Sequence, residues 1–120
     1  MDPAQANGIG QQFLAAYTGA LEQQNAATLG SLYGADSIAI YDGNVVRGSQ
    51  AILQGLFAPR LGQGPIKTRV SGFSAQATPT NHMVITVDGE YSNPAGHFKQ
   101  VFVLSSIPTG GMYIKADVCR

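Results

Sequence analysis

The feature that most constrains the fold is a series of four strand-like segments that fills the second half of the chain. These segments are rich in β-branched and aromatic residues, and the sequences between them contain Pro, Gly and Asn, which favour turns. The predicted strands cover residues 66–77, 83–91, 97–107 and 112–119. Because consecutive strands joined by short turns pair antiparallel, we expect a meander sheet.

The first half of the chain shows helical periodicity instead. Apolar residues recur at three- and four-residue intervals along a first helix, which is predicted over residues 7–24. Asn25 is a suitable N-cap for a second, short helix. The apolar residues of that second helix are Leu29, Leu32 and Tyr33. Gly34 is expected to end it.

A hairpin and a third helix precede the long strands. Residues 37–41 and 44–47 are predicted to be two strands, and the Asp42-Gly43 pair between them is a strong hairpin signal. The third helix is predicted to begin with Ser49 as its N-cap. It is predicted to stop at Pro59, because proline lacks the backbone N–H that a helix interior requires.

This order of elements predicts a single α+β domain over residues 1–120, with helices packed on one face of a sheet. The middle strands are apolar on both faces, whereas a half-buried strand alternates apolar and polar residues. Because the helices cover only one face, we expect the other face to form a homodimer. The predicted dimer interface contains Val84, Val101, Val103 and Tyr113. A few valines on an open face are the alternative interpretation.

Composition and charge exclude several classes of protein. Seven Lys and Arg residues balance seven Asp and Glu residues, so the chain lacks the basic surplus that nucleic-acid binding requires. No apolar run reaches the roughly 18 residues of a membrane span, and the N-terminus does not resemble a signal peptide. The single cysteine, Cys119, favours a reducing intracellular compartment. His82 and His97 lack the spacing of metal ligands, so we expect no metal and no cofactor.

Several short motifs resemble the nuclear transport factor 2 family. They occur in the family's order from about residue 8 to residue 120. The motifs are IGQQF at residues 9–13 with Tyr17, LGSLY at 29–33, YDG at 41–43, GSQAI at 48–52, QATPT at 76–80, FKQVFVL at 98–104, and Asp117 with Arg120. The resemblance implies a cone-shaped fold, in which a long N-terminal helix and two shorter helices pack on a strongly bent antiparallel or mixed sheet. It also implies an apolar cavity at the open end of the cone and a dimer through the sheet.

The resemblance further implies a function in nuclear transport. Members of this family carry the small GTPase Ran, in its GDP form, into the nucleus, and they bind Phe-rich repeats of nucleoporins. The implied protein is not an enzyme, and it is found in the cytoplasm and the nucleus with enrichment at the nuclear pore. In the family, an aromatic residue of Ran enters the cavity, and acidic residues at the rim pair with Lys and Arg of Ran.

Residues matched by position define the Ran site that the resemblance implies. Asp42 corresponds to a rim acid, and Tyr41 corresponds to the aromatic residue beside it, which is usually Trp in the family. The positions that correspond to the lining of the cavity are Leu61, Ile66 and Val118. From the residues alone, Asp42 is equally suited to forming its turn, and Tyr41 to ordinary packing in a strand.

The sequence departs from the family at several places, which include a loop after the fourth strand, the N-terminal region, and Cys119, where the family has a Phe. The loop at residues 91–94 is shorter than in the family and contains no acid, so the second acidic cluster is missing. Asp88 and Glu90 are expected to replace that cluster if the shortened hairpin brings them to the rim. Ala6 stands where the family has a Trp that helps to bind Phe-rich repeats.

Two other functions remain open at this stage. The chain is also suited to be a small adaptor subunit that pairs with a nuclear export receptor or scaffold. The same fold also hosts enzymes that act on small apolar ligands, and such a site needs an acid or base inside the cavity. The candidates for those groups are Tyr17 with Asp36, Asp88 or Asp117.

Overall fold

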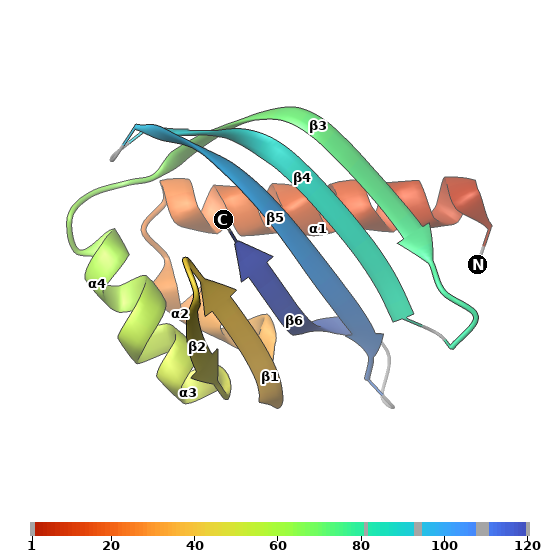
Figure 1. Ribbon diagram of the computed structural model, residues 1–120, viewed down its shortest axis with the longest axis horizontal. Helices are drawn as coiled ribbons and strands as arrows, with labels where there is room; N and C mark the ends of the chain where they lie inside the picture. The colour runs from red at the N-terminus through yellow and green to blue at the C-terminus, as the bar shows by residue number, and fades with distance from the viewer. Residues whose placement is uncertain (1, 81, 93–94, 108–110, 120) are drawn as a thin grey trace.

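A six-stranded sheet curls around one long helix, and short helical segments close one end of the molecule (Figure 1). The computed structural model describes residues 2–80, 82–92, 95–107 and 111–119. Its elements are α1 (Pro3–Glu22), α2 (Ala26–Ser31), β1 (Tyr33–Tyr41), β2 (Asn44–Arg47), α3 (Ser49–Ile52), η1 (Leu53–Phe57), α4 (Ala58–Leu61), β3 (Lys67–Ala77), β4 (His82–Ser92), β5 (Gly96–Ser106) and β6 (Met112–Cys119). The arrangement confirms the predicted α+β fold with a long N-terminal helix.

Some residues of the predicted turns and of the last family motif lie outside the described residues. They are Asn81, residues 93–94, residues 108–110 and Arg120. Within the described residues, no helix is long and apolar enough to span a membrane.

Helix α1 begins at Pro3, earlier than the predicted residue 7. The Asp2 carboxylate accepts a hydrogen bond from Gln5 N at 2.8 Å, and the Gln5 side chain accepts one from Asp2 N at 3.0 Å. This reciprocal pair is a capping box, and Pro3 suits the first turn because its missing N–H has no helical partner there. The helix ends at Glu22, before the predicted residue 24.

The second helix is shorter than predicted, and Tyr33 and Gly34 belong to strand β1 instead. The predicted cap is confirmed, since Asn25 Oδ1 accepts a hydrogen bond from Thr28 N at 3.1 Å. The chain leaves the helix because it pairs with the last strand: Ile114 N donates to Leu32 O at 2.8 Å. Strand pairing therefore overrides the helical preference of this segment.

The hairpin between β1 and β2 is confirmed. Asp42 and Gly43 have φ angles of 50° and 83°, the left-handed pair that a type I′ turn requires. The turn places Tyr41 and Asp42 at one end of strand β1.

The third helical segment begins one residue earlier and runs further than predicted. Its N-cap is Gly48, with a φ of 85°, and Ser49 is already helical. The segment passes through the π-helical η1 and continues beyond Pro59 to Leu61. Pro59 lies in the first turn of α4, where its missing N–H is tolerated. The prediction that Pro59 stops the helix is therefore wrong.

The sheet is mixed, with strand order β2-β1-β6-β5-β4-β3. The four long strands form the predicted antiparallel meander, and their bounds lie within one residue of those expected. Strand β1 joins this meander by pairing parallel with β6, which sets Ala39 opposite Asp117 and Tyr41 opposite Cys119. The two halves of the sequence thus meet along β1 and β6.

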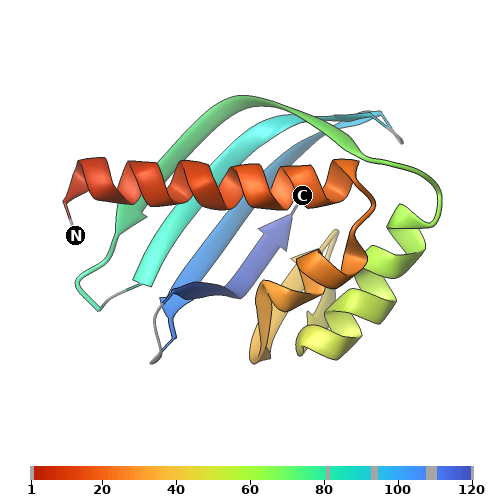
Figure 2. The same ribbon diagram turned by 180° about the vertical axis from the view of Figure 1, so that it is seen from behind.

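The inner face of the sheet packs on α1, which crosses it in Figure 2. The Phe102 ring contacts the rings of Phe13 and Tyr17 edge-on, with centroid distances of 5.0 Å to each. Gly10 permits this close packing, because a Cβ there would lie 2.7 Å from Ala75 Cβ on β3.

The outer face of the meander carries a row of valines. Val84 lies opposite Val103, and Val101 lies opposite Val118, across adjacent strands. Val101 is 36% exposed in the isolated chain, and the other three are half-buried. We use the name outer valine patch for these four residues. The strands are therefore apolar on both faces, as the sequence predicts.

Candidate functional site

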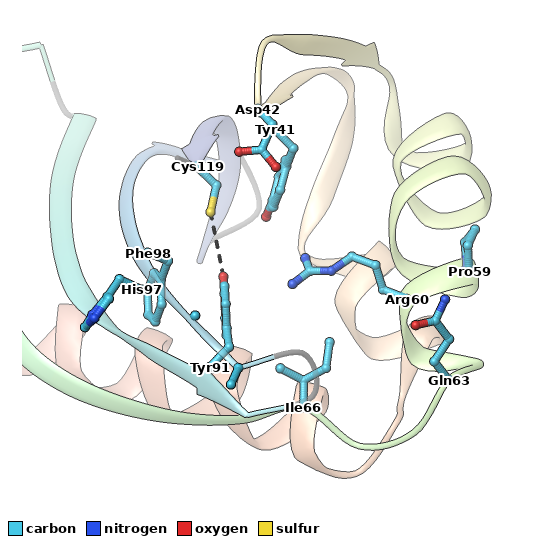
Figure 3. A pocket seen from close by; sticks show the side chains of 12 residues that line it. Tyr41, Asp42, Pro59, Arg60, Gln63, Ile66, Tyr91, His97, Phe98 and Cys119 are labelled. Atoms are coloured by element: carbon cyan, nitrogen blue, oxygen red, sulfur yellow. Dashed lines mark hydrogen bonds between the residues drawn. The ribbon is translucent and has the colours of Figure 1, made fainter.

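A cavity of about 420 Å³ opens at the end of the sheet where the β1–β2 turn, α4 and the start of β5 approach one another (Figure 3). Its lining comes from four regions of the chain that are far apart in the sequence, near residues 41–42, 59–66, 91–98 and 119. The lining residues are Tyr41, Asp42, Pro59, Arg60, Gln63, Ile66, Tyr91, Ala95, Gly96, His97, Phe98 and Cys119. The cavity exists only because the curled sheet brings the ends of β1, β4 and β6 together.

One wall of the cavity is aromatic and apolar. The rings of Tyr91 and Phe98 stack with a centroid distance of 4.3 Å and an interplanar angle of 18°. Ile66, which precedes β3, is buried and lies at the base in Figure 3. These side chains form a surface suited to an apolar or aromatic group.

Arg60 extends from α4 into the cavity, between Tyr41 and Tyr91 (Figure 3). Its guanidinium carbon lies 5.6 Å from the Tyr41 ring centroid and 5.4 Å from that of Tyr91, within the range of cation–π contacts. The Nη1 atom is buried and makes no hydrogen bond with the described residues. The cavity therefore combines an aromatic wall with a positive charge.

A buried polar network lies directly behind the cavity and centres on Asp117, which has no exposed surface. The Tyr33 and Tyr41 hydroxyls donate to Asp117 Oδ2 at 2.6 and 2.8 Å. Gln100 Nε2 donates to Asp117 Oδ1 at 2.7 Å and to the Tyr41 hydroxyl at 2.9 Å. The Tyr17 hydroxyl lies 3.0 Å from that of Tyr41. The network fixes the position of Tyr41 at the cavity.

Burial determines the ionisation of this network. It raises the pKa of Asp117 to about 6, although the hydrogen bonds from Tyr33, Gln100 and Tyr41 oppose the rise. It also raises the pKa of Tyr41 and Tyr33 well above the ordinary value, so both phenols remain neutral hydrogen-bond donors. Near neutral pH the carboxylate is held by neutral donors and not by an ion pair.

Cys119 lies at the mouth of the cavity, and its sulfur is 3.7 Å from the Tyr91 hydroxyl (Figure 3). Burial raises the pKa of the Cys119 thiol above its ordinary value. Cys119 is therefore a neutral thiol that packs against Tyr91, not an activated nucleophile.

The structure brings three of the predicted Ran-site residues together at this cavity. Tyr41, Asp42 and Ile66 all line it. Leu61 is buried in the core but does not line the cavity.

The prediction that Val118 lines the cavity is wrong. Side chains alternate along a strand, and its neighbours Asp117 and Cys119 face inward. Val118 therefore lies on the outer face, where it is part of the outer valine patch.

Asp88 and Glu90 do not line the cavity, although Glu90 contacts His97, which does. Both lie at alternate positions of β4 that face outward, opposite to the buried Val87 and Gly89. The Glu90 carboxylate is 3.1 Å from Arg69 Nη2 and 3.6 Å from His97 Nδ1 on that face. The shortened hairpin therefore leaves the cavity with Asp42 as the acid in its lining.

Sequence reasoning missed the residues that give the cavity its chemistry. Arg60 was hidden because the helix was expected to stop one residue before it. Tyr91 and Phe98 were assigned to strands, but their ends were not expected to meet around a cavity. Asp117 was identified as a family motif residue and as a candidate acid, but its hydrogen bonds with Tyr33, Tyr41 and Gln100 were not predicted.

The sequence matches the nuclear transport factor 2 domain over residues 9–120. The chain therefore belongs to the nuclear transport factor 2 domain family. No curated protein matches the sequence.

Several solved structures resemble nearly the whole chain. Nuclear transport factor 2 from Cryptosporidium parvum is 26% identical, with a TM-score of 0.80 over 97% of this chain and 94% of that one. A putative ketosteroid isomerase from Shewanella frigidimarina is 12% identical, with a TM-score of 0.81 over 93% and 94%. A putative dehydratase from Streptomyces avermitilis is 16% identical, with a TM-score of 0.77 over 96% and 92%. The two bacterial similarities show the fold alone.

Proposed function

We propose that the protein is a nuclear import carrier that binds Ran in its GDP form and Phe-rich nucleoporin repeats. In this proposal it acts as a homodimer without catalysis, and it moves between cytoplasm and nucleus through the nuclear pore. The observation that carries the proposal is the meeting of Tyr41, Asp42 and Ile66 at one cavity. The family and the similarity to a structure described as nuclear transport factor 2 support it.

The cavity has the properties that capture of an aromatic side chain requires. Its volume of about 420 Å³ lies within the common range for ligand sites. Transfer of a Phe side chain from water to such a wall contributes about 1.5–3 kcal/mol. Asp42 is exposed at the mouth, where a carboxylate steers a basic partner and sets its orientation more than it adds affinity.

The proposed homodimer forms through the outer face of the sheet. The outer valine patch includes three of the predicted interface residues, Val84, Val101 and Val103. Tyr113 lies on the same face opposite Ser105, and its hydroxyl donates to Asp36 at 3.0 Å. A contiguous apolar surface on a sheet is typical of an interface between proteins.

The buried network argues against a catalytic role for the strongest acid–base candidate. Both oxygens of Asp117 already accept hydrogen bonds from within the chain, and no part of its side chain is exposed. A general base needs a lone pair within reach of its substrate. This arrangement favours a structural role for Asp117 and supports a binding protein over an enzyme.

The test is a calorimetric titration of the protein with Ran-GDP, and with Ran-GTP, at two salt concentrations. We expect binding of the GDP form alone, weaker at high salt because Asp42 contributes electrostatic attraction. Asp42→Lys is expected to abolish the heat of binding.

The matched control is Glu22→Lys, which makes a charge change of the same size on an exposed residue at the end of α1 that does not line the cavity. This variant is expected to bind as the original protein does. Equal losses in both variants would contradict the cavity as the site. No binding to either form of Ran would contradict the carrier function and favour an adaptor that pairs with a different protein.

A further inference from the structure

Arg60 is a partly buried cation without a carboxylate partner among the described residues. The ion pairs there are Arg69–Glu90 and His97–Glu90, both on the outer face of the sheet. Arg60 Nη1 is enclosed by protein atoms and forms no hydrogen bond with these residues. Because a buried donor is most stable when it is paired, Nη1 is available to donate to an acceptor that enters the cavity.

The surroundings of Arg60 keep its charge. Burial lowers the pKa of Arg60, but the nearby Tyr91, Tyr17 and Tyr41 together raise it by more. The net result is a pKa above the ordinary value. The faces of Tyr41 and Tyr91 stabilise the cation, and Tyr91 also forms a side-chain hydrogen bond with Arg60. Nη1 remains without a hydrogen-bond partner among the described residues, and the guanidinium end of the side chain points into the cavity (Figure 3).

The backbone places Arg60 firmly. It follows Pro59, whose ring fixes φ, and it lies one turn after the π-helical η1. A π-helical turn changes the direction of the side chains that follow it and often occurs at functional sites. The backbone of the third helical segment therefore directs the Arg60 side chain into the cavity.

We propose that Arg60 pairs with a carboxylate that enters the cavity beside an aromatic ring, and that a partner protein supplies both groups from one segment. This inference rests on the proposed function for the source of the ligand. The ring packs against the wall formed by Tyr91 and Phe98, and the carboxylate accepts hydrogen bonds from Arg60. Arg60 is thus a specificity-determining residue.

The charges around the cavity favour a carboxylate over a phosphate. Among the described lining residues, Arg60 supplies the only arginine or lysine side chain, and Asp42 lies at the same mouth. A dianion there would meet one cation and one carboxylate, whereas a monoanion balances Arg60 alone. The planar guanidinium also matches the two oxygens of a carboxylate.

The first experiment tests the chemistry of Arg60 without any protein partner. The probes are 3-phenylpropionate and its neutral isostere 3-phenylpropanamide, titrated separately and followed by the ¹⁵N signals of the arginine side chains. We expect the acid to bind about tenfold more tightly than the amide, because a charge-assisted hydrogen bond is lost in the amide. Arg60→Gln is expected to remove that preference.

The matched control is Arg69→Gln, since Arg69 is an exposed arginine on the outer face. It is expected to retain the preference for the acid. Arg60→Lys keeps the charge but not the planar donor pair, and we expect an intermediate preference. Thermal unfolding of each variant confirms that it is folded. Equal binding of acid and amide, or an unchanged preference in Arg60→Gln, would overturn the proposal.

The second experiment uses Ran-GDP to test the source of the carboxylate. We expect Arg60→Gln to weaken binding about tenfold, and a change of one acidic residue of Ran to its amide to give the same loss, non-additively. If the acid probe binds through Arg60 but Ran-GDP does not bind, the proposed function and the protein source fail while the role of Arg60 stands. If Ran-GDP binds and Arg60→Gln has no effect on it, the protein source of the carboxylate is overturned.

Discussion

The two faces of strands β5 and β6 each carry residues that are unusual for their side of a sheet. On the inner face, two polar residues, Gln100 and Asp117, are fully buried next to the aromatic core. On the outer face, Val101 and Val118 lie opposite each other, and the described chain leaves Val101 exposed and Val118 half-buried. A polar pair is thus inside and an apolar pair is outside.

The contrast between the inner polar residues and the outer valines distinguishes two roles of the sheet. The inner polar residues are satisfied within the chain, and they position Tyr41 at the cavity. The outer valines are only partly covered by the described residues, so their full burial requires another molecule. The inner face therefore determines the geometry of the cavity, whereas the outer face is suited to binding another protein molecule.

The largest expected contrast comes from neighbouring residues of β5 on opposite faces. Phe102→Ala removes a buried ring that contacts Phe13 and Tyr17, and we expect it to lower the free energy of unfolding by about 3–5 kcal/mol. Val101→Ala is expected to lower it by less than about 1 kcal/mol in the monomer. Chemical denaturation at matched low protein concentration measures both. Similar losses would show that both faces are core.

The next contrast concerns pH. The pKa of Asp117 is about 6 in the folded chain and 3.8 as an ordinary value, so the folded state binds the proton more tightly. Stability from this group is present below about pH 4 and is lost as pH rises through about 6, a loss of about 3 kcal/mol. Asp117→Asn does not titrate, so its stability should lack this decline. Denaturation at several pH values compares the two slopes, and parallel slopes would refute the assignment.

A smaller effect is expected on the outer face. Val103→Asp places a charge in the outer valine patch, and we expect it to weaken the proposed dimer at least about tenfold while the chain stays folded. Sedimentation equilibrium measures the molar mass. Gln54→Asp, at an exposed position of η1, is the control and should leave the mass unchanged. A monomeric original protein would exclude the homodimer and favour a different partner for this face.

The sequence was sufficient for the parts of the fold that local patterns determine. The alternation of the long strands and the Asp42-Gly43 turn depend on neighbouring residues, and both were predicted closely. The start of α1 at Pro3 and the end of the third helical segment at Leu61 were not predicted, because each depends on a local detail of the helix. The Asp2–Gln5 box begins α1 early, and the π-helical turn lets the third segment pass Pro59.

The cavity was predicted only in part, because it is made by contacts between distant segments. Matching by position found Tyr41, Asp42 and Ile66, but it misplaced Val118 by one residue of strand alternation. A shift of one residue moves a side chain to the other face, and position alone does not resolve it. No local sequence pattern predicts the position of Arg60 in the cavity, because that position depends on the rings of Tyr41 in β1 and Tyr91 in β4.

The parallel pairing of β1 with β6 has a consequence for how the molecule forms. Strands β3 to β6 follow one another through short connections, so each pairs with a neighbour in the sequence. The register of Tyr41 with Cys119 instead joins residues from opposite halves of the chain. Such distant pairing must close a long loop, which costs chain entropy. We therefore expect the meander to form before β1 pairs with β6, and the cavity to be completed last.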